Sequence, residues 1–469
     1  MDKNKNGGAN PLATEPIRKL IIKFAVPSII SFLVGALYNI VDQIFIGQGV
    51  GMLGNAATNV AFPLTTISTS VALLIGIGSA SNFNLELGAG NKERAGGIAG
   101  TGIFLLTIVG FILAAIVLIF LKPMMVAFGA TDQVLPYALT YTSITAFGIP
   151  LLIFSIGCSH LIRADGKPTY SMLCMMSGAI LNTILDPLFI FGFGWGIGGA
   201  ALATVMGQLL SAIIAARYLF KFRTVKLTKD YLRPQKIFIK AIAGLGAAAC
   251  FNQLAMTVVQ ITMNNTLTYY GAMSQYGSEI PLACVGVISK VNIVFMSFIL
   301  GISQGCQPIN GFNYGAKNYD RVRKTFLTAA GAVTVVSVIA FLSFQIFPRQ
   351  IVSIFGDGTE AYFHFAERYF RIFMLLMFIN GLQPMIANFF TSIGKAKMGI
   401  LISMTRQIIF LLPLILIFPM FMGIDGVMYA GPIADGAAAI VAITMALREL
   451  KKMKHLELEA VMEDRISGV

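Results

Sequence analysis

The sequence predicts an all-α integral membrane protein in which twelve transmembrane helices form two pseudo-symmetric six-helix lobes around a central cleft. Three observations support this fold class: long apolar segments, a one-sided distribution of basic residues, and an internal repeat. Of the 469 residues, 56% are hydrophobic and only 12% are charged. Soluble proteins carry about 25% charged residues. The composition therefore excludes an ordinary soluble enzyme.

Twelve apolar segments follow one another between polar breaks. A helix needs roughly 20 residues to cross the hydrocarbon core of a bilayer, and it satisfies its backbone hydrogen bonds within the segment. The short alternating strands of a membrane barrel are absent from the sequence. We therefore expect helical spans near residues 20–46, 56–85, 98–121, 135–162, 170–192, 197–219, 238–268, 283–310, 325–347, 367–390, 398–421 and 427–449.

The basic residues indicate the orientation of these spans. With the N-terminus inside, 28 of the 34 Lys and Arg residues fall in cytoplasmic segments, whereas the outer loops hold only Lys122 and Arg349. Such asymmetry is typical of multi-pass proteins, and it explains the net charge of +13 without a nucleic-acid partner. We expect a protein of the cell (inner) membrane, embedded in the lipid bilayer, with both termini in the cytoplasm.

An internal repeat relates the two halves of the chain. Shifted by about 227 positions, LGAGNKERA after the second span matches YGAKNYDRV after the eighth, and Gly166-Lys167 matches Gly394-Lys395. Six spans per half is an even number, so both halves start from the same side and form a parallel repeat. The pattern predicts an N-lobe, a basic cytoplasmic linker, a C-lobe and a cytoplasmic tail at residues 1–220, 221–237, 238–450 and 451–469. Because two lobes supply a complete pathway, a monomer suffices.

Two carboxylates lie within the spans of the first half. Asp42 is about five residues from the outer end of the first span, and Asp186 is about six residues from the outer end of the fifth. At about 1.5 Å of rise per residue, both lie at a similar depth. Asn182 shares a helix face with Asp186, and Thr204 lies at a comparable depth in the sixth span. Ionisable residues inside a membrane mark functional sites by default.

These four side chains form a candidate cation site. Carboxylate, amide and hydroxyl oxygens suit Na⁺, and two close carboxylates in a low dielectric suit a proton, because both cannot stay ionised. The alternative is that Asp42 and Asp186 only cap helix ends or bond neighbouring helices. We expect no catalytic residue and no cofactor, and the coupling ion is H⁺ or Na⁺.

Five further residues are weaker candidates for the substrate pathway or for gating. Asn39 and Gln43 flank Asp42, where substrate contact and interhelical hydrogen bonding are equally good interpretations. Pro27 is a place where the first helix could bend. Lys290 and Asp435 lie at similar depths in the eighth and twelfth spans, so we expect a buried ion pair between them, while Arg406 lies nearer the inner face and can extend to water.

The chain resembles the multidrug and toxic compound extrusion (MATE) family, in its bacterial members. The resemblance is carried by Pro27 with YNIVDQIFIG, by LGAGNKERA and its repeat, by RADGKP after the fourth span, and by NTILDPLFIFGFGWGIGGAALAT. It implies export of drugs by alternating access, and a cation site in the N-lobe at Asp42, Asn182, Asp186 and Thr204. Some relatives also use carboxylates in helices 7 and 10, which this sequence lacks.

The expected function is secondary active export of amphipathic, often cationic small molecules, coupled to H⁺ or Na⁺ as an antiport. The alternative within transport is a flippase for lipid-linked precursors, for which Lys290 and Arg406 are the relevant cations. An intramembrane enzyme is disfavoured because HExxH and GxSxG are absent, and a primary pump because no GxxxxGK[ST] loop is present. A channel would not need two duplicated halves.

Overall fold

The computed structural model describes residues 10–277, 279–354 and 359–467, with side chains described as far as residue 459 except that of Lys229. Within these residues every regular element is a helix. Eleven helices are long and apolar enough to span a membrane, and a bent pair brings the number to twelve when it is counted as one span. The predicted all-α, twelve-span class is confirmed.

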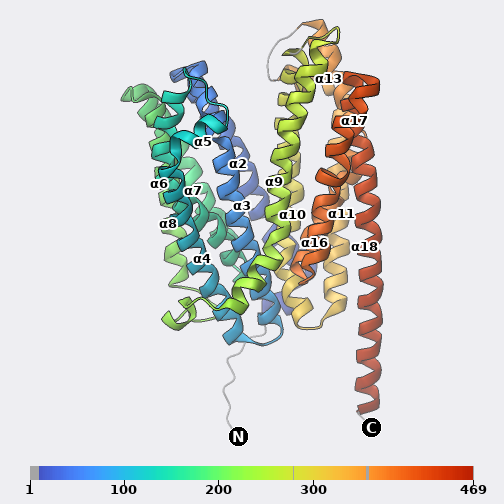
Figure 1. Cartoon of the computed structure of the whole chain (residues 1–469). Coiled ribbons are helices and arrows are strands. Elements are labelled where there is room, and N and C mark those ends of the chain that lie inside the picture. Colours follow the sequence, from blue (N-terminus) through green and yellow to red (C-terminus); the bar gives the residue numbers. More distant parts are fainter. Residues whose placement is uncertain (1–9, 278, 355–358, 468–469) are drawn as a thin grey trace.

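The helices form two groups that stand side by side (Figure 1). The first half contains α1 (Pro11–Thr14), α2 (Ile17–Gly49), α3 (Met52–Gly88), α4 (Lys92–Ile119), α5 (Leu121–Ala127), α6 (Leu135–Ala164), α7 (Pro168–Pro187), the π-helical turn η1 (Leu188–Gly192) and α8 (Gly196–Leu219). The 3₁₀ turn η2 (Lys229–Leu232) lies in the connection to the second half. The second half contains α9 (Lys236–Ala272), α10 (Glu279–Gly315), α11 (Tyr319–Ile346), α12 (Pro348–Ser353), α13 (Glu360–Phe373), α14 (Met377–Asn380), α15 (Leu382–Ser392), α16 (Ala396–Met404), the π-helical turn η3 (Thr405–Leu411), α17 (Leu412–Met422) and α18 (Ile424–Ser467).

The tenth span differs from the continuous helix expected over residues 367–390. The chain bends by 48° between Glu360–Phe373 and Met377–Ser392. Two residues explain why the helix does not continue smoothly beyond the bend. Pro384 has no N–H to donate to the carbonyl group of Asn380, and Gly381 packs so closely against Ser337 that a larger residue would not fit.

The two lobes pack through two equivalent interhelical contacts, each of which contains a glycine. A Cβ atom at Gly246 of α9 would collide with the carbonyl group of Leu74 on α3, and one at Gly301 of α10 would lie 2.6 Å from the backbone of Ile29 on α2. The repeat offset of 227 relates Leu74 to Gly301. The contact of α3 with α9 is thus the counterpart of the contact of α10 with α2, as a pseudo-two-fold axis between the lobes requires.

The repeated loop motifs contact each other at the same end of the molecule. Gly88 packs on the carbonyl group of Phe312, and Gly315 packs on that of Leu85. Both pairs obey the offset of 227, so the contact is reciprocal. These close approaches all lie in the halves of the helices nearest to the chain termini, and they hold the lobes together at that end.

The repeat extends to backbone conformation. Gly90 and Lys317, 227 residues apart, both have left-handed backbones, with φ of 84° and 58°. Gly166 and Gly394 match in the same way, with φ of 85° and 82°. The short sequence similarities therefore mark equivalent turns in the two halves, which supports the parallel repeat.

The basic connection between the halves packs on the N-lobe. Buried Asp165 accepts hydrogen bonds from the Tyr218 hydroxyl at 2.7 Å and from the backbone N–H groups of Arg223 and Thr224 at 2.8 and 3.0 Å. The boundaries predicted at residues 220 and 237 stay predictions, and residues 1–9 and 468–469 of the outermost predicted segments lie outside the described residues.

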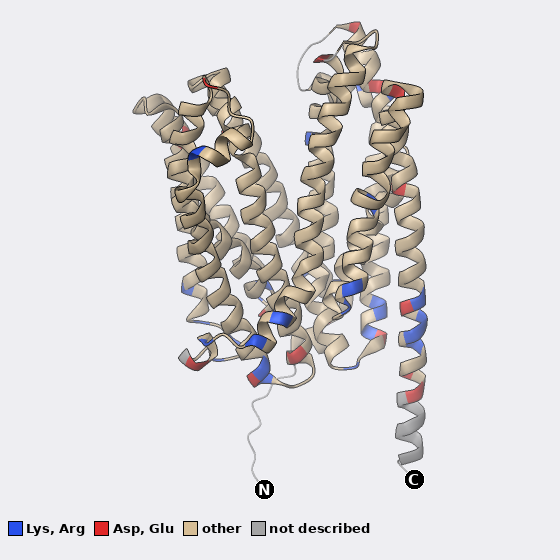
Figure 2. Cartoon of the chain, viewed as in Figure 1, with Lys and Arg blue, Asp and Glu red and all other residues tan. Residues whose placement is uncertain are grey.

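Lys and Arg gather at the end of the molecule where both termini lie (Figure 2). The helices α5 and α13, which contain Lys122, Arg368 and Arg371, lie toward the opposite end (Figure 1). The distribution in space thus follows the pattern read from the sequence, and it is the pattern that the positive-inside rule associates with the cytoplasmic face.

Candidate cation site and central cavity

Two glycines bring α7 and α8 together one turn from the candidate site. A Cβ atom at Gly207 would lie 2.6 Å from the carbonyl oxygen of Gly178, and 3.1 Å from Cβ of Asn182. This close approach sets Asn182 and Thr204 opposite each other. The Asn182 amide nitrogen lies 3.4 Å from the Thr204 hydroxyl.

Asp186 lies at the end of α7, directly before the π-helical turn η1. Its side chain is fully buried, and its Oδ1 accepts a hydrogen bond from the Asn182 amide at 3.3 Å. In either orientation of its amide, Asn182 bridges Asp186 and Thr204. Insertions of this kind in a helix are frequent at functional sites, because they turn a side chain away from the regular helical face.

Asp42 reaches the same place from α2. The outer end of α2 packs on η1, where Ile46 and Ile190 form a small buried cluster. The half-buried carboxyl group of Asp42 is then close enough to Asp186 to share a hydrogen bond when one of the two is protonated. Asp42 Oδ1 is buried and makes no hydrogen bond within the described residues.

All four residues predicted for the cation site are therefore neighbours in the fold. Two tyrosines join them that the sequence did not point to: Tyr38 precedes Asp42 by four residues on α2, and Tyr141 of α6 lines the same cavity as Asp42 and Thr204. The spacing of four residues could have indicated Tyr38. Tyr141 carries no such signal, because it comes from a different helix.

The oxygen set fits a small hard cation. It offers two carboxyl groups, an amide and a hydroxyl, and oxygen is the ligand type that Na⁺ and other hard cations take. The buried Asp42 Oδ1 without a partner is an acceptor that a cation or a proton would satisfy. Within the described residues no group of three or more His, Cys, Asp and Glu could hold a metal ion, so neutral oxygens would have to complete the coordination of a metal here.

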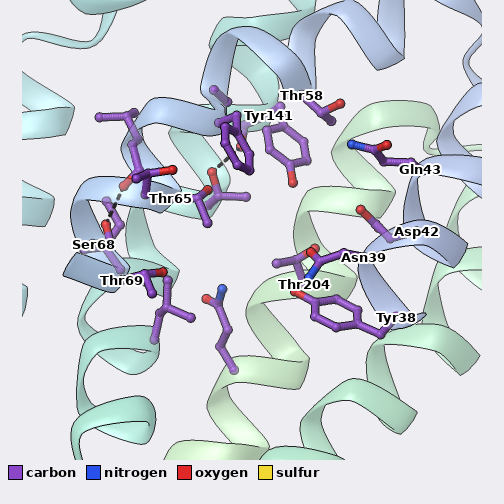
Figure 3. A pocket seen from close by; sticks show the side chains of 18 of the residues that line it. Tyr38, Asn39, Asp42, Gln43, Thr58, Thr65, Ser68, Thr69, Tyr141 and Thr204 are labelled. Carbon is purple, nitrogen blue, oxygen red and sulfur yellow. Dashed lines mark hydrogen bonds between the residues drawn. The ribbon is translucent and has the colours of Figure 1, made fainter. Parts of the chain in front are cut away.

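The site opens on a cavity of about 460 Å³ between the lobes. In Figure 3, Asp42 and Gln43 of α2 lie across this cavity from Thr65 and Ser68 of α3. Asn39 also lines it, although its amide is bonded to the carbonyl group of Gly35 at 2.7 Å. The candidate cation site therefore has direct access to a space large enough for a small organic molecule.

The expected ion pair between Lys290 and Asp435 is wrong. Asp435, which is 2% exposed, bonds Arg406 Nε at 2.5 Å instead. Arg406 does not extend to water at the inner face, since it lies in the π-helical turn η3 and points at α18. Lys290 is exposed and lines the 460 Å³ cavity, on the C-lobe side.

Pro27 is buried in α2, at the contact between the lobes. Its neighbours on the helix, Ala25 and Ile29, pack on Gly305 and Gly301 of α10. Proline removes the hydrogen bond to the residue one turn earlier, so α2 is weakened at the level where it touches the other lobe. A role in bending stays a prediction.

Comparisons with known proteins agree over most of the chain. The MatE family model matches residues 27–188 and 248–417. The chain is 24% identical over 430 residues to the multidrug export protein MepA of Staphylococcus haemolyticus (strain JCSC1435), covering 91% of this chain and 92% of the relative. It is 23% identical over 431 residues to MepA of Staphylococcus aureus (strain MRSA252), covering 91% and 93%.

The fold is also that of solved transporters. A structure described as the outward-facing conformation of a multidrug resistance MATE family transporter of the MOP superfamily superposes with a TM-score of 0.88 at 22% identity, covering 97% of this chain and all of the other. At this identity the likeness establishes the two-lobed fold alone.

Proposed function

The chain belongs to the MatE family, and from this premise we propose that it is a secondary active exporter. In this proposal, inward movement of H⁺ or Na⁺ through the site at Asp42, Asn182, Asp186 and Thr204 drives outward transport of amphipathic, often cationic small molecules. One observation carries the proposal: two carboxyl groups share a buried site that opens on the 460 Å³ cavity between the lobes.

The geometry suggests how the two movements are coupled. Without a bound cation, the negative charge of Asp42 favours an organic cation in the adjoining cavity. A proton or Na⁺ at Asp42 and Asp186 neutralises that charge, so the organic cation is released. The two ligands then favour different states of the lobes, which is the condition for a ligand to shift a conformational population.

Pro27 supports the conformational step. The first helix carries Asp42 near its outer end and packs on the C-lobe around Pro27. We infer that neutralisation of Asp42 lets α2 bend near Pro27, which changes its contact with α10 and with it the opening between the lobes. The termini are placed in the cytoplasm by this proposal, following the positive-inside rule.

Transport in proteoliposomes tests the function. A lipophilic cationic dye such as ethidium is loaded, and Na⁺ and proton gradients are imposed separately. We expect dye movement under at least one gradient, and loss of at least about 90% of it in Asp42→Asn. The matched control is Asp132→Asn, which removes an exposed carboxylate in the loop before α6. Equal transport by Asp42→Asn and wild type would exclude the coupling role.

A second candidate function is a flippase for lipid-linked precursors, and the position of Lys290 in the cavity favours it. A pyrophosphate group would bind this cation and would not need the two carboxylates. Transport of a fluorescent prenyl diphosphate that persists in Asp42→Asn and disappears in Lys290→Gln would support this function over drug export.

A further inference from the structure

Another cavity lies between the lobes, on the side of the outer cavity that faces the chain termini. Its volume is about 290 Å³, and its lining comes from α2, α3, α6 and α7 of one lobe and from α9, α10, α15 and α16 of the other. Thr69 and Gln253 line both this inner cavity and the 460 Å³ outer cavity. The two are therefore parts of one continuous cleft.

The inner cavity contains a buried arginine. Arg163 occupies the last turn of α6 and is 5% exposed, although its position in the sequence had placed it in a cytoplasmic loop. Its guanidinium group donates to the side-chain oxygen of Gln304 at 3.1 Å, a neutral acceptor on the other lobe. Guanidinium has five N–H donors, so one such bond leaves most of them available.

No nearby carboxylate neutralises this charge in the part of the chain that the structure describes. Asp165 is only two residues away, but its oxygens accept bonds from Tyr218 and from the backbone of the linker. The ion pairs of the described residues include none with Arg163. The carbonyl groups at the C-terminal end of α6 offset part of the charge, yet a buried cation without an anion is costly inside a membrane protein.

The rest of the lining adds neutral polar groups and no acid. Besides Arg163 and His160, the described lining combines apolar side chains with amides and hydroxyl groups, and it includes no Asp or Glu. The ionisable side chains of the inner cavity are thus basic, whereas those of the site at Asp42 and Asp186 are acidic.

We propose that the inner cavity is a binding subsite for the carboxylate group of an amphipathic substrate, with Arg163 as its anchor. This inference rests on the proposed export function and adds to it a subsite for substrates that carry a carboxylate as well as an amine. Arg binds carboxylates through two parallel hydrogen bonds, which a neutral amide partner such as Gln304 does not replace. The carboxylates at the outer end then receive the cationic group of the same molecule.

The length of the cleft suits such a molecule. Ser31 lines the inner cavity and Asp42 the outer one, and both belong to α2. Eleven residues of helix separate them, which corresponds to about 16 Å at 1.5 Å per residue. A substrate of several fused or linked rings, with an amine at one end and a carboxylate at the other, spans this distance.

A matched pair of dyes tests the subsite. Rhodamine B carries a free carboxylate, whereas its methyl ester is a pure cation of nearly the same shape. Binding of each to the purified full-length protein is measured by fluorescence polarisation for the wild type, for Arg163→Gln, and for Arg217→Gln. The last variant removes an equivalent but exposed arginine at the end of α8 and serves as the control.

We expect Arg163→Gln to weaken rhodamine B binding by about ten- to a hundredfold, the usual effect of losing a charge-assisted hydrogen bond. The ester should change by less than about twofold, and Arg217→Gln should bind both dyes as the wild type does. If Arg163→Gln does not fold, Arg163→Lys is measured instead; it retains the charge but not the two parallel bonds, so rhodamine B alone should weaken.

Four results would overturn the subsite. In Arg163→Gln, the affinity for both dyes could be unchanged, or it could fall equally for both. The other two are a loss of affinity for rhodamine B alone in Lys290→Gln instead of Arg163→Gln, and equal displacement of both dyes from the wild type by farnesyl diphosphate. An equal loss in Arg163→Gln and Gln304→Leu would assign the arginine to the contact between the lobes. Transport of the ester by wild-type proteoliposomes tests the export function separately. If the ester is not transported but rhodamine B binding still depends on Arg163, export is refuted and the subsite is retained.

Discussion

Asp42 and Asp435 are both carboxylates within membrane spans, but they have different surroundings. Asp435 is almost fully buried and is bonded to Arg406. Asp42 has a buried oxygen without a partner in the described residues and faces an open cavity. The charge of Asp435 is therefore neutralised within the protein, whereas that of Asp42 is available to a ligand. This difference separates a structural carboxylate from a candidate coupling carboxylate.

The pair of Asp435 and Arg406 predicts a large effect on stability. Arg406→Leu leaves Asp435 buried without a partner, and breaking a buried pair in this way costs about 3 to 5 kcal/mol. We expect a clearly lower thermal midpoint for the detergent-purified protein. Replacing both residues by Leu should recover much of the loss, because no uncompensated charge remains.

A surface pair provides the control for this prediction. Arg94 is 56% exposed and lies 3.2 Å from Glu86, and exposed pairs contribute about 1 kcal/mol or less. Arg94→Leu should leave the thermal midpoint nearly unchanged. A midpoint for Arg406→Leu that matches that of Arg94→Leu would mean that the buried pair does not stabilise the fold.

At the scale of single residues, the sequence predicts neighbours within a helix better than partners between helices. Asn182 and Asp186 could be grouped because four residues make one turn. The wrong partner for Asp435 has a physical origin: depth in the membrane follows from counting residues, but the rotation of each helix about its axis does not. Lys290 has the right depth and points into the cavity, on a different side from Asp435.

At the scale of helices, small residues decide which elements touch. Gly246 and Gly301 allow α9 and α10 to approach α3 and α2 more closely than any side chain would permit. The apolar segments made the spans predictable from hydropathy alone. The bend at residues 374–376, between α13 and α14, was not, because the sequence FMLLMFI stays apolar through it and hydropathy shows no break there.

Two glycines on α9 offer a matched test of this packing. Gly246→Ala places a Cβ atom against the backbone of Leu74, which cannot rotate away as a side chain would. Overpacking of this kind costs about 1 to 3 kcal/mol, so we expect a lower thermal midpoint and a loosened contact between the lobes. Gly244→Ala has no atom within 4 Å of the new Cβ.

Gly244→Ala should be neutral or slightly stabilising, since Ala favours a helix over Gly by about 1 kcal/mol. Thermal melting of the two purified variants checks the difference. Equal midpoints for the two variants would show that the α3–α9 contact tolerates extra volume, and would remove the argument that this contact fixes the spacing of the lobes.

At the scale of the whole molecule, the contacts between the lobes are unevenly distributed. The glycine contacts lie toward the end that carries the termini, and the 460 Å³ cavity lies toward the other end. The lobes also separate at that other end in Figure 1. The duplication could be predicted from the sequence, and the orientation stays a prediction from the basic residues. The asymmetry could not be predicted, because both lobes carry equivalent motifs that are compatible with either state of an alternating-access cycle.

The asymmetry predicts from which side the cavity is accessible. Gln43 is exposed and lines the outer cavity, whereas Ser81 of α3 is 3% exposed in the contact near the termini. Gln43→Cys and Ser81→Cys are made after replacement of the five native cysteines, of which four are buried. With the termini in the cytoplasm, a membrane-impermeant maleimide added to intact cells should label Gln43→Cys. Ser81→Cys should react at least about tenfold more slowly, in line with the low reactivity of buried thiols. A cationic dye that occupies the cavity should protect Gln43→Cys from the reagent.

Two outcomes would contradict this prediction. Labelling of Gln43→Cys only in inside-out vesicles would mean that the orientation in the membrane is reversed or that the lobes open at the opposite end. Comparable labelling of the two positions from outside would contradict a closed contact at the end with the termini, because water and reagent would then reach through the whole cleft.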